Sequence, residues 1–293
     1  MKQMMFAAML ALTAGLTTTM AQAQAQARET GDDKVLRVCA DPNNMPLSND
    51  KGEGYENKIA ELLAKDLGWP LEYTYFPQRM GFVRMTLKAK HPTIPGKYKC
   101  DLIIGVPVGF DLGATIKPYF RSTYAMVFRK GTGLDEVKVP DDLLKLPPEK
   151  LHALRFGVFS QTPPVDWLLR NKLFDQAVSY QRQSGDPEAY PGEIVEKELV
   201  AGKVDVAMAW GPIAGYFGRN TKAADLVTVP FPPENSIKFD YAITMAVRYG
   251  EKDWKNRIEE VVQRNLPGIQ AILTSYGVPL IDESQAGHTV VDR

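Results

Sequence analysis

The residue types that most often carry catalysis or bind metals are few and scattered in this chain. Its three histidines, His91, His152 and His288, lie far apart, and none has a partner at metal-ligand spacing. Two of them sit beside proline-rich linkers and the third in a polar tail, so we expect all three at the surface. Gly52-x-Gly54 precedes a predicted helix but lacks the close preceding strand and the third glycine of a dinucleotide motif. These patterns predict no catalytic residue, no metal site and no cofactor.

Three carboxylates could lie at one cleft. Asp41, Glu56 and Asp111 could line it, and carboxylates in a cleft can do acid–base work. The alternative is that Asp41 and Glu56 hold the rim of the cleft together by hydrogen bonds. We favour the second interpretation and expect a protein that is not an enzyme.

The first 27 residues have the pattern of a signal peptide. Lys2 gives a positive start, an apolar stretch runs from Met5 to about Leu16, and small residues from Ala21 onward fit a cleavage site. The apolar stretch is shorter than the roughly 20 residues that a membrane-spanning helix needs. The alternative, a buried N-terminal helix, gives no reason for the alternation of Ala with Gln after Ala21. We therefore predict an exported, periplasmic protein from which residues 1–27 are removed.

The charge balance excludes several classes of partner. Lys2 is the only charged residue in that segment, so 34 basic and 35 acidic residues remain in the rest of the chain. Such a balance gives no electrostatic footprint for nucleic acid, and no polybasic run suggests a lipid surface. No later segment is long and apolar enough to predict a membrane span.

Cys39 and Cys100 are the only cysteines. In an oxidising compartment an isolated pair is more often bonded than free. A bond would close a loop of about 60 residues and contribute roughly 4 kcal/mol on the chain-entropy view. The alternative is two buried thiols that act as small apolar residues. Cysteines this far apart in sequence predict neither a zinc site nor a CxxC redox motif.

Strand and helix patterns alternate along the chain from Lys34 onward. Short apolar runs predict strands at 35–40, 71–76, 101–106, 124–128, 155–159, 204–209, 226–229 and 241–247. Apolar faces at helical spacing predict helices around 59–67, 163–169, 194–199, 254–262 and 269–276, the second opened by Pro163-Pro164. This alternation predicts an α/β fold in which mainly parallel sheets are flanked by helices.

The length predicts two lobes rather than one core. Nearly 270 residues remain after the signal peptide, which is long for a single core. The segments that begin at Tyr124 and Tyr241 echo each other, as expected if each carries the chain between lobes. We expect 34–128 with 238–285 to form lobe 1, 129–237 to form lobe 2, and 286–293 to be a polar tail.

Six segments carry a family resemblance: Leu36-Arg-Val-Cys-Ala-Asp-Pro-Asn-Asn, Gly54-Tyr-Glu-Asn-Lys-Ile-Ala, Cys100-Asp-Leu-Ile-Ile-Gly-Val-Pro, Lys117-Pro-Tyr-Phe-Arg-Ser, Gly202-Lys-Val-Asp-Val-Ala-Met-Ala-Trp-Gly-Pro and Tyr276-Gly-Val-Pro. Together they resemble the type II (family 3) periplasmic solute-binding proteins, which bind polar amino acids. Within that family the chain is most similar to the MxaJ/XoxJ group, whose members are associated with quinoprotein methanol dehydrogenase. The resemblance implies the two-lobed type II periplasmic-binding-protein fold.

The chain departs from that family where an amino acid would bind. The family usually holds the ligand's carboxylate with an Arg shortly after the strand at 101–106, but here no Arg or Lys occurs before Lys117. It usually holds the ammonium with an Asp at the position of Trp210. Pro163 and Pro164 would remove two backbone donors from a helix start that often binds the carboxylate. Because a buried unpaired charge costs several kcal/mol, we expect no tight binding of free amino acids.

We therefore predict a non-catalytic periplasmic protein that assists or activates a PQQ-dependent methanol dehydrogenase through protein contact. The alternative is a receptor that delivers a small solute to an ABC permease. The candidate cleft or partner-contact residues are Asp41, Asn43, Asn44, Tyr55, Glu56, Pro107, Phe110, Gln161, Thr162, Trp210 and Tyr216. Aromatic side chains suit such a contact because they bury a large area at low entropic cost. Several of them could equally be core residues, and for Trp210 the two interpretations stay open.

Overall fold

The computed structural model describes residues 30–182, 186, 188–282 and 284. The predicted signal peptide, 1–27, and the predicted polar tail, 286–293, lie outside the described residues.

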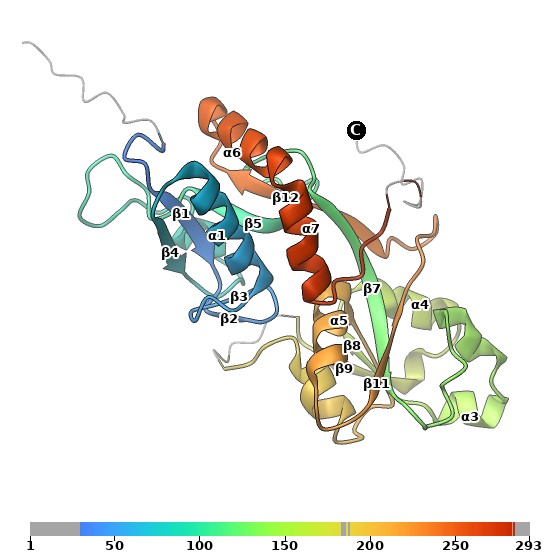
Figure 1. Cartoon of the computed structure of the whole chain (residues 1–293). Coiled ribbons are helices and arrows are strands. Elements are labelled where there is room, and N and C mark those ends of the chain that lie inside the picture. The colour runs from blue at the N-terminus through green and yellow to red at the C-terminus, as the bar shows by residue number, and fades with distance from the viewer. Residues whose placement is uncertain (1–29, 183–185, 187, 283, 285–293) are drawn as a thin grey trace, which may run out of the picture.

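The described chain alternates strands and helices (Figure 1). The strands are β1 (Leu36–Ala40), β2 (Asn43–Asn44), β3 (Ser48–Asn49), β4 (Leu71–Tyr75), β5 (Leu102–Pro107), β6 (Ala114–Thr115), β7 (Phe120–Arg129), β8 (Phe156–Phe159), β9 (Ala177–Tyr180), β10 (Val206–Trp210), β11 (Leu226–Pro230) and β12 (Asp240–Val247). The α-helices are α1 (Tyr55–Leu67), α2 (Phe82–Met85), α3 (Pro148–Ala153), α4 (Pro163–Arg170), α5 (Gly211–Asn220), α6 (Lys252–Arg264) and α7 (Leu266–Ser275). Short helical turns, η1 (Pro140–Lys145), η2 (Phe174–Gln176) and η3 (Ile194–Leu199), complete the set.

Two parallel groups of strands are joined by two long antiparallel strands. The order is β4-β1-β5-β12-β7-β10-β8-β9, in which β4, β1 and β5 run parallel, as do β10, β8 and β9. The first half of β7 pairs with β12, and its second half pairs with β10 and β11. We call the part built on β4, β1, β5 and β12 the first lobe and the part built on β10, β8, β9 and β11 the second lobe. Figure 1 shows β7 running from one lobe to the other. The predicted α/β fold is confirmed, but the sheet is mixed and not mainly parallel, because β12, β7, β6 and β11 pair antiparallel with their neighbours.

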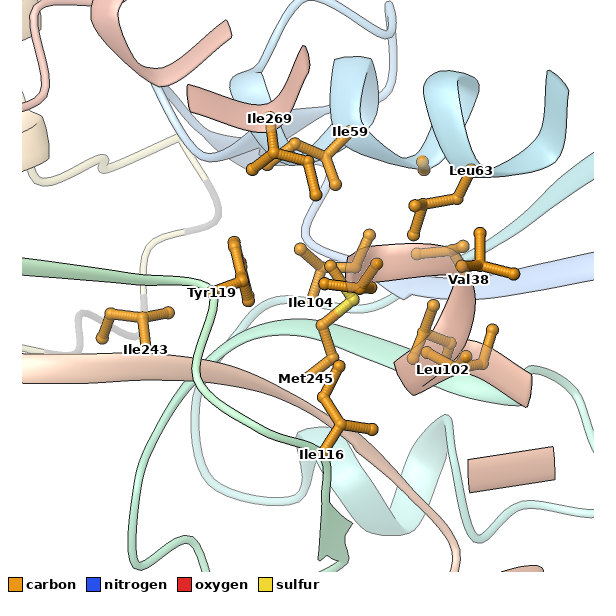
Figure 2. Close-up of a cluster of buried hydrophobic side chains, with 14 of the residues drawn as sticks. Val38, Ile59, Leu63, Leu102, Ile104, Ile116, Tyr119, Ile243, Met245 and Ile269 are labelled. Atoms are coloured by element: carbon orange, nitrogen blue, oxygen red, sulfur yellow. The ribbon is translucent and has the colours of Figure 1, made fainter. Parts of the chain in front are cut away.

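The first lobe has its main core between its sheet and helices α1, α6 and α7. Ile59 and Leu63 lie on the buried side of α1, and Gly68 ends this helix in the left-handed conformation, with φ 66°. Figure 2 shows the side chains of Ile59 and Leu63 above those of Val38 and Ile104 from the sheet. The 3.6-residue pattern in the sequence therefore predicted the buried face of α1 correctly.

The sheet of the second lobe is buried on both sides. Alternate residues of its central strands enter two different cores: Met126 and Met208 pack into one, and Val127 and Ala207 into the other. Helix α4 contributes Trp167 to the first core, and α5 contributes Ala214 to the second. Such two-sided burial explains why these strands read as continuous apolar runs. The lobe limits given above as residue ranges stay a prediction.

The two cysteines form a disulfide. Cys39 in β1 and Cys100, just before β5, have Cα atoms 5.4 Å apart, and both are buried in a small cluster with Phe82, Leu87 and Ile103. The bond therefore ties the strand that opens the first lobe to the start of its neighbour in the sheet. This confirms the bonded alternative.

Candidate functional site

A cavity of about 510 Å³ lies between the two lobes. The first lobe supplies residues from the turn after β1, the loop after β4 and the end of β5, and the second lobe supplies residues from the loop after β9 and the start of α5. Five of the eleven predicted site residues line it: Asp41, Asn43, Asn44, Pro107 and Phe110. This position agrees with the rule that ligands of α/β proteins bind beyond the carboxyl ends of the strands.

Asp41 holds the rim of this cavity together. One carboxylate oxygen accepts a hydrogen bond from the backbone N–H of Asn43 at 2.8 Å, and the other accepts one from the backbone N–H of Gln78. The backbone N–H of Asp41 is in turn bonded to the Ser48 hydroxyl. Both oxygens thus fix the position of two loops, as expected of a carboxylate that holds the rim rather than one that moves protons.

The two asparagines bridge neighbouring parts of the rim. Asn44 donates from its amide to the side-chain oxygen of Gln78 at 2.9 Å. Asn43 reaches across the cleft, where its amide donates to the backbone oxygen of Glu188 at 3.2 Å. The Asn43 amide therefore links the first lobe to the loop after β9 at the mouth of the cavity.

Glu56 and Tyr55 lie beneath the cleft instead of lining it. The Glu56 side chain is only 7% exposed, and its Oε1 has no hydrogen-bond partner among the described residues. That oxygen faces Gly105, which lines the cavity with φ +81°; a Cβ atom at this glycine would lie 1.9 Å from it. Burial, reinforced by the negative charge of Asp41, raises the pKa of Glu56 well above its ordinary value. Glu56 is therefore a buried carboxyl under the floor, where burial favours its neutral form, and Tyr55 is a core residue whose ring packs edge-on to Phe120.

The other four predicted residues lie away from the cavity. Trp210 packs edge-on against Tyr124 and Tyr241, with centroids 5.4 and 5.9 Å away, where the chain passes between lobes. Tyr216 stacks on Tyr276 at 5.8 Å. Gln161 is exposed and Thr162 is buried, with its hydroxyl bonded to the backbone oxygen of Phe159. A role for these residues in partner contact stays a prediction.

The start of α4 offers few backbone donors, as its two prolines predict. Pro163 and Pro164 open α4 and have no N–H, and the N–H of Val165 is already bonded to the oxygen of Thr162. None of these residues lines the cavity between the lobes. The first three residues of α4 therefore have no free N–H group to bind a carboxylate.

The lack of Arg and Lys between Pro107 and Lys117 does not extend to the whole cleft. Arg79 and Arg182 both line the cavity, together with Asp41 and Asp186. Sequence reasoning missed the arginines because they lie in loops that no strand or helix pattern marks. The cleft is consequently a surface of mixed charge.

The described ranges contain neither a candidate metal cluster nor a helix that could span a membrane. No three His, Cys, Asp or Glu side chains there gather in a way that could hold a metal ion. None of the helices formed by those residues combines the length and apolar character needed to cross a bilayer.

No family model matches the chain. The crystal structure of the periplasmic binding protein XoxJ from Methylobacterium extorquens AM1 is 34% identical, covers 85% of this chain and 100% of its own, and superposes with a TM-score of 0.67. This chain belongs to the XoxJ family. Its fold is accordingly the two-lobed type II periplasmic-binding-protein fold.

Further relatives carry related names. Protein MoxJ from Methylorubrum extorquens is 29% identical over 308 residues, which cover 95% of this chain and 96% of that protein. MxaJ from Methylophaga aminisulfidivorans MPT has a TM-score of 0.68 at 24% identity, covering 84% of this chain and 100% of its own, and shows the shared fold alone. Amino-acid-binding proteins at 17–20% identity likewise share only the fold with this XoxJ-family protein.

Proposed function

We propose that this protein is a non-catalytic periplasmic partner of a PQQ-dependent methanol dehydrogenase, which it assists or activates by binding a segment of the enzyme between its lobes. Membership of the XoxJ family, with relatives named MoxJ and MxaJ, is the basis for the choice of partner. The mode of contact is argued from the cleft itself.

The observation that carries the proposal is that the cavity between the lobes has a second cavity beside it. This second cavity, of about 590 Å³, opens on the first lobe, and four residues line both: Gln78, Arg79, Val106 and Phe110. The two cavities are therefore adjacent, with Phe110 in the wall of both, and we call them together the depression. Two adjacent hollows fit a length of polypeptide better than a small solute, which is bound by burying most of its surface.

A second candidate, the solute receptor of an ABC permease, is favoured by one feature. The cavity between the lobes has side chains of both signs, Arg79 and Arg182 against Asp41 and Asp186, as a zwitterion would need. Against it, both oxygens of Asp41 already accept backbone hydrogen bonds, and Arg79 and Asp186 already interact with other residues. Binding a solute ion would compete with these contacts.

Binding to purified dehydrogenase separates the two functions. We expect the immobilised protein to bind the dehydrogenase, and Phe110→Ala to weaken that binding because it removes a ring from the wall of both cavities. Phe174→Ala is the matched control, since Phe174 is 43% exposed in η2 and lines neither cavity. Equal binding of wild type and Phe110→Ala would contradict the proposed contact. A large thermal stabilisation by one of the standard amino acids, without dehydrogenase binding, would establish the receptor instead.

A further inference from the structure

The second cavity has a chemistry of its own. Its apolar lining comes from α2 and the turn before it, from β5 and from the loop after β5; the apolar residues are Met80, Phe82, Val83, Ile103, Val106, Phe110 and Leu112. Its polar rim contains Arg79, Arg84 and Lys88 together with Gln78, and no Asp or Glu of the described residues lines it. We call this hollow the basic groove.

Apolar side chains of the basic groove are unusually exposed. Met80 is 91% exposed, and Leu112 is 45% exposed; Met85, beside the groove in α2, is 39% exposed. Exposed apolar residues gathered in one place, with polar residues around them, mark binding surfaces. Methionine suits such a surface because its flexible, polarisable side chain adapts to different partners.

Two of the three cations of the groove have no ion-pair partner among the described residues. Neither Arg84 nor Lys88 forms an ion pair with a described residue, and both are exposed. These two exposed cations therefore favour a negatively charged ligand. The chain as a whole is neutral, so this local excess is a feature of the groove and does not follow from the composition.

We propose that the basic groove binds a short segment of the partner protein in which Asp or Glu residues flank one or two bulky apolar side chains. The apolar residues would enter the hollow over Phe82 and Phe110, and the acidic residues would face Arg84 and Lys88. A protein segment fits better than an anionic membrane, because the apolar residues line a hollow of about 590 Å³ that a flat lipid surface cannot fill. The inference rests on the proposed function, since it names the part of the partner that the cleft would take.

Synthetic peptides test the chemistry directly. The probe is fluorescein-labelled Asp-Glu-Leu-Phe-Glu-Asp, compared with Lys-Arg-Leu-Phe-Arg-Lys and with Asp-Glu-Ser-Ser-Glu-Asp. We expect only the first peptide to bind measurably, with an affinity that falls as salt is added because exposed charges are screened. Equal binding of the basic peptide would overturn the proposal, as would equal binding of the peptide without apolar residues.

Charge reversal locates the site. Arg84→Glu/Lys88→Glu should weaken the acidic peptide about tenfold, the equivalent of roughly 1.4 kcal/mol. Lys130→Glu/Lys222→Glu is the matched control, because it changes the net charge equally at exposed positions of the second lobe. Met80→Ser should weaken binding at least threefold, and Leu169→Ser, at a 52% exposed residue of α4, should not. Melting temperatures of all variants check that they fold.

The same variants separate failure of this inference from failure of the proposed function. If the dehydrogenase binds wild type, and binding weakens with Arg84→Glu/Lys88→Glu but not with the control pair, both proposals are supported. If the dehydrogenase binds all variants equally, the proposed role of the basic groove is refuted while the proposed partnership stands. If the dehydrogenase does not bind at all, the proposed partnership fails, and peptide binding alone tests the role of the basic groove. Binding to phosphatidylglycerol vesicles that the charge reversal abolishes, with no peptide binding, would show a lipid site and refute the proposal.

Discussion

The contact between Gly105 and Glu56 gives a sharp test of how the floor of the cleft is built. We expect Gly105→Ala to destabilise the protein for two separable reasons. The left-handed backbone, at φ +81°, costs an L-residue about 1–2 kcal/mol. The new Cβ would lie 1.9 Å from Glu56 Oε1, and because Glu56 is buried the overpacking costs about 1–3 kcal/mol more. The expected loss is therefore about 2–5 kcal/mol in the free energy of unfolding.

A double-mutant cycle separates the two costs. In a Glu56→Ala background the carboxyl is gone, so Gly105→Ala should lose only the backbone cost, and the coupling free energy should be about 1–3 kcal/mol. Glu56→Gln keeps the bulk and should leave most of the coupling in place. Urea unfolding measured by circular dichroism gives the four free energies. If Gly105→Ala costs the same with Glu56 and with Ala at position 56, Glu56 does not lie against the floor of the cleft and the reasoning fails.

Three further predictions concern the same lobe. Because burial raises the pKa of Glu56 above its ordinary 4.5, the free energy of unfolding of the wild type falls as pH rises above 4.5, by about 1.4 kcal/mol per unit of pKa shift. Glu56→Gln does not ionise and should therefore gain stability relative to wild type above about pH 4.5. An equal difference between the two proteins at about pH 4 and about pH 8 would contradict this. Cys39→Ala/Cys100→Ala opens a loop with a sequence separation of 61 and should lose about 4 kcal/mol in urea unfolding, whereas wild type in reductant should approach the variant. Asp41→Ala removes the acceptor of two backbone N–H groups and should lose about 2 kcal/mol, with faster hydrogen exchange at Asn43 and Gln78; unchanged exchange there would count against a role in the rim.

Much of the fold could be predicted because its strongest elements have strong local patterns. The apolar run at 101–106 became β5, and the two amphipathic faces near the C-terminus became α6 and α7. β9 was missed, since this edge strand is half-exposed and has no continuous apolar run. The passage of β7 between the lobes was indicated only by its echo in β12, because pairing between distant strands leaves no local pattern.

The site was less predictable than the fold. The turn after β1 and the end of β5 could be placed at the cleft, because the carboxyl ends of neighbouring parallel strands meet at one edge. Trp210 also ends a strand, yet its ring turns toward Tyr124 and Tyr241, and both neighbours come from strands whose pairing the sequence does not show. Arg79 and Arg182 were missed for a similar reason, since loop residues reach the cleft only through the tertiary arrangement.

The polar groups of the cleft argue for a macromolecular ligand because most of them are already engaged. Asp41 and Asn43 hold the rim and the contact between lobes, and the N–H groups at the start of α4 are missing or bonded. A small zwitterion would have to displace these bonds at both of its charged ends, and each displaced group would be left unpaired. A polypeptide needs no such exchange, since it can bury apolar side chains over Phe110 and meet the exposed cations Arg84 and Lys88. The groups that can bind a ligand without displacing a hydrogen bond therefore lie along the depression. A solute receptor would instead have them in the cavity between its lobes.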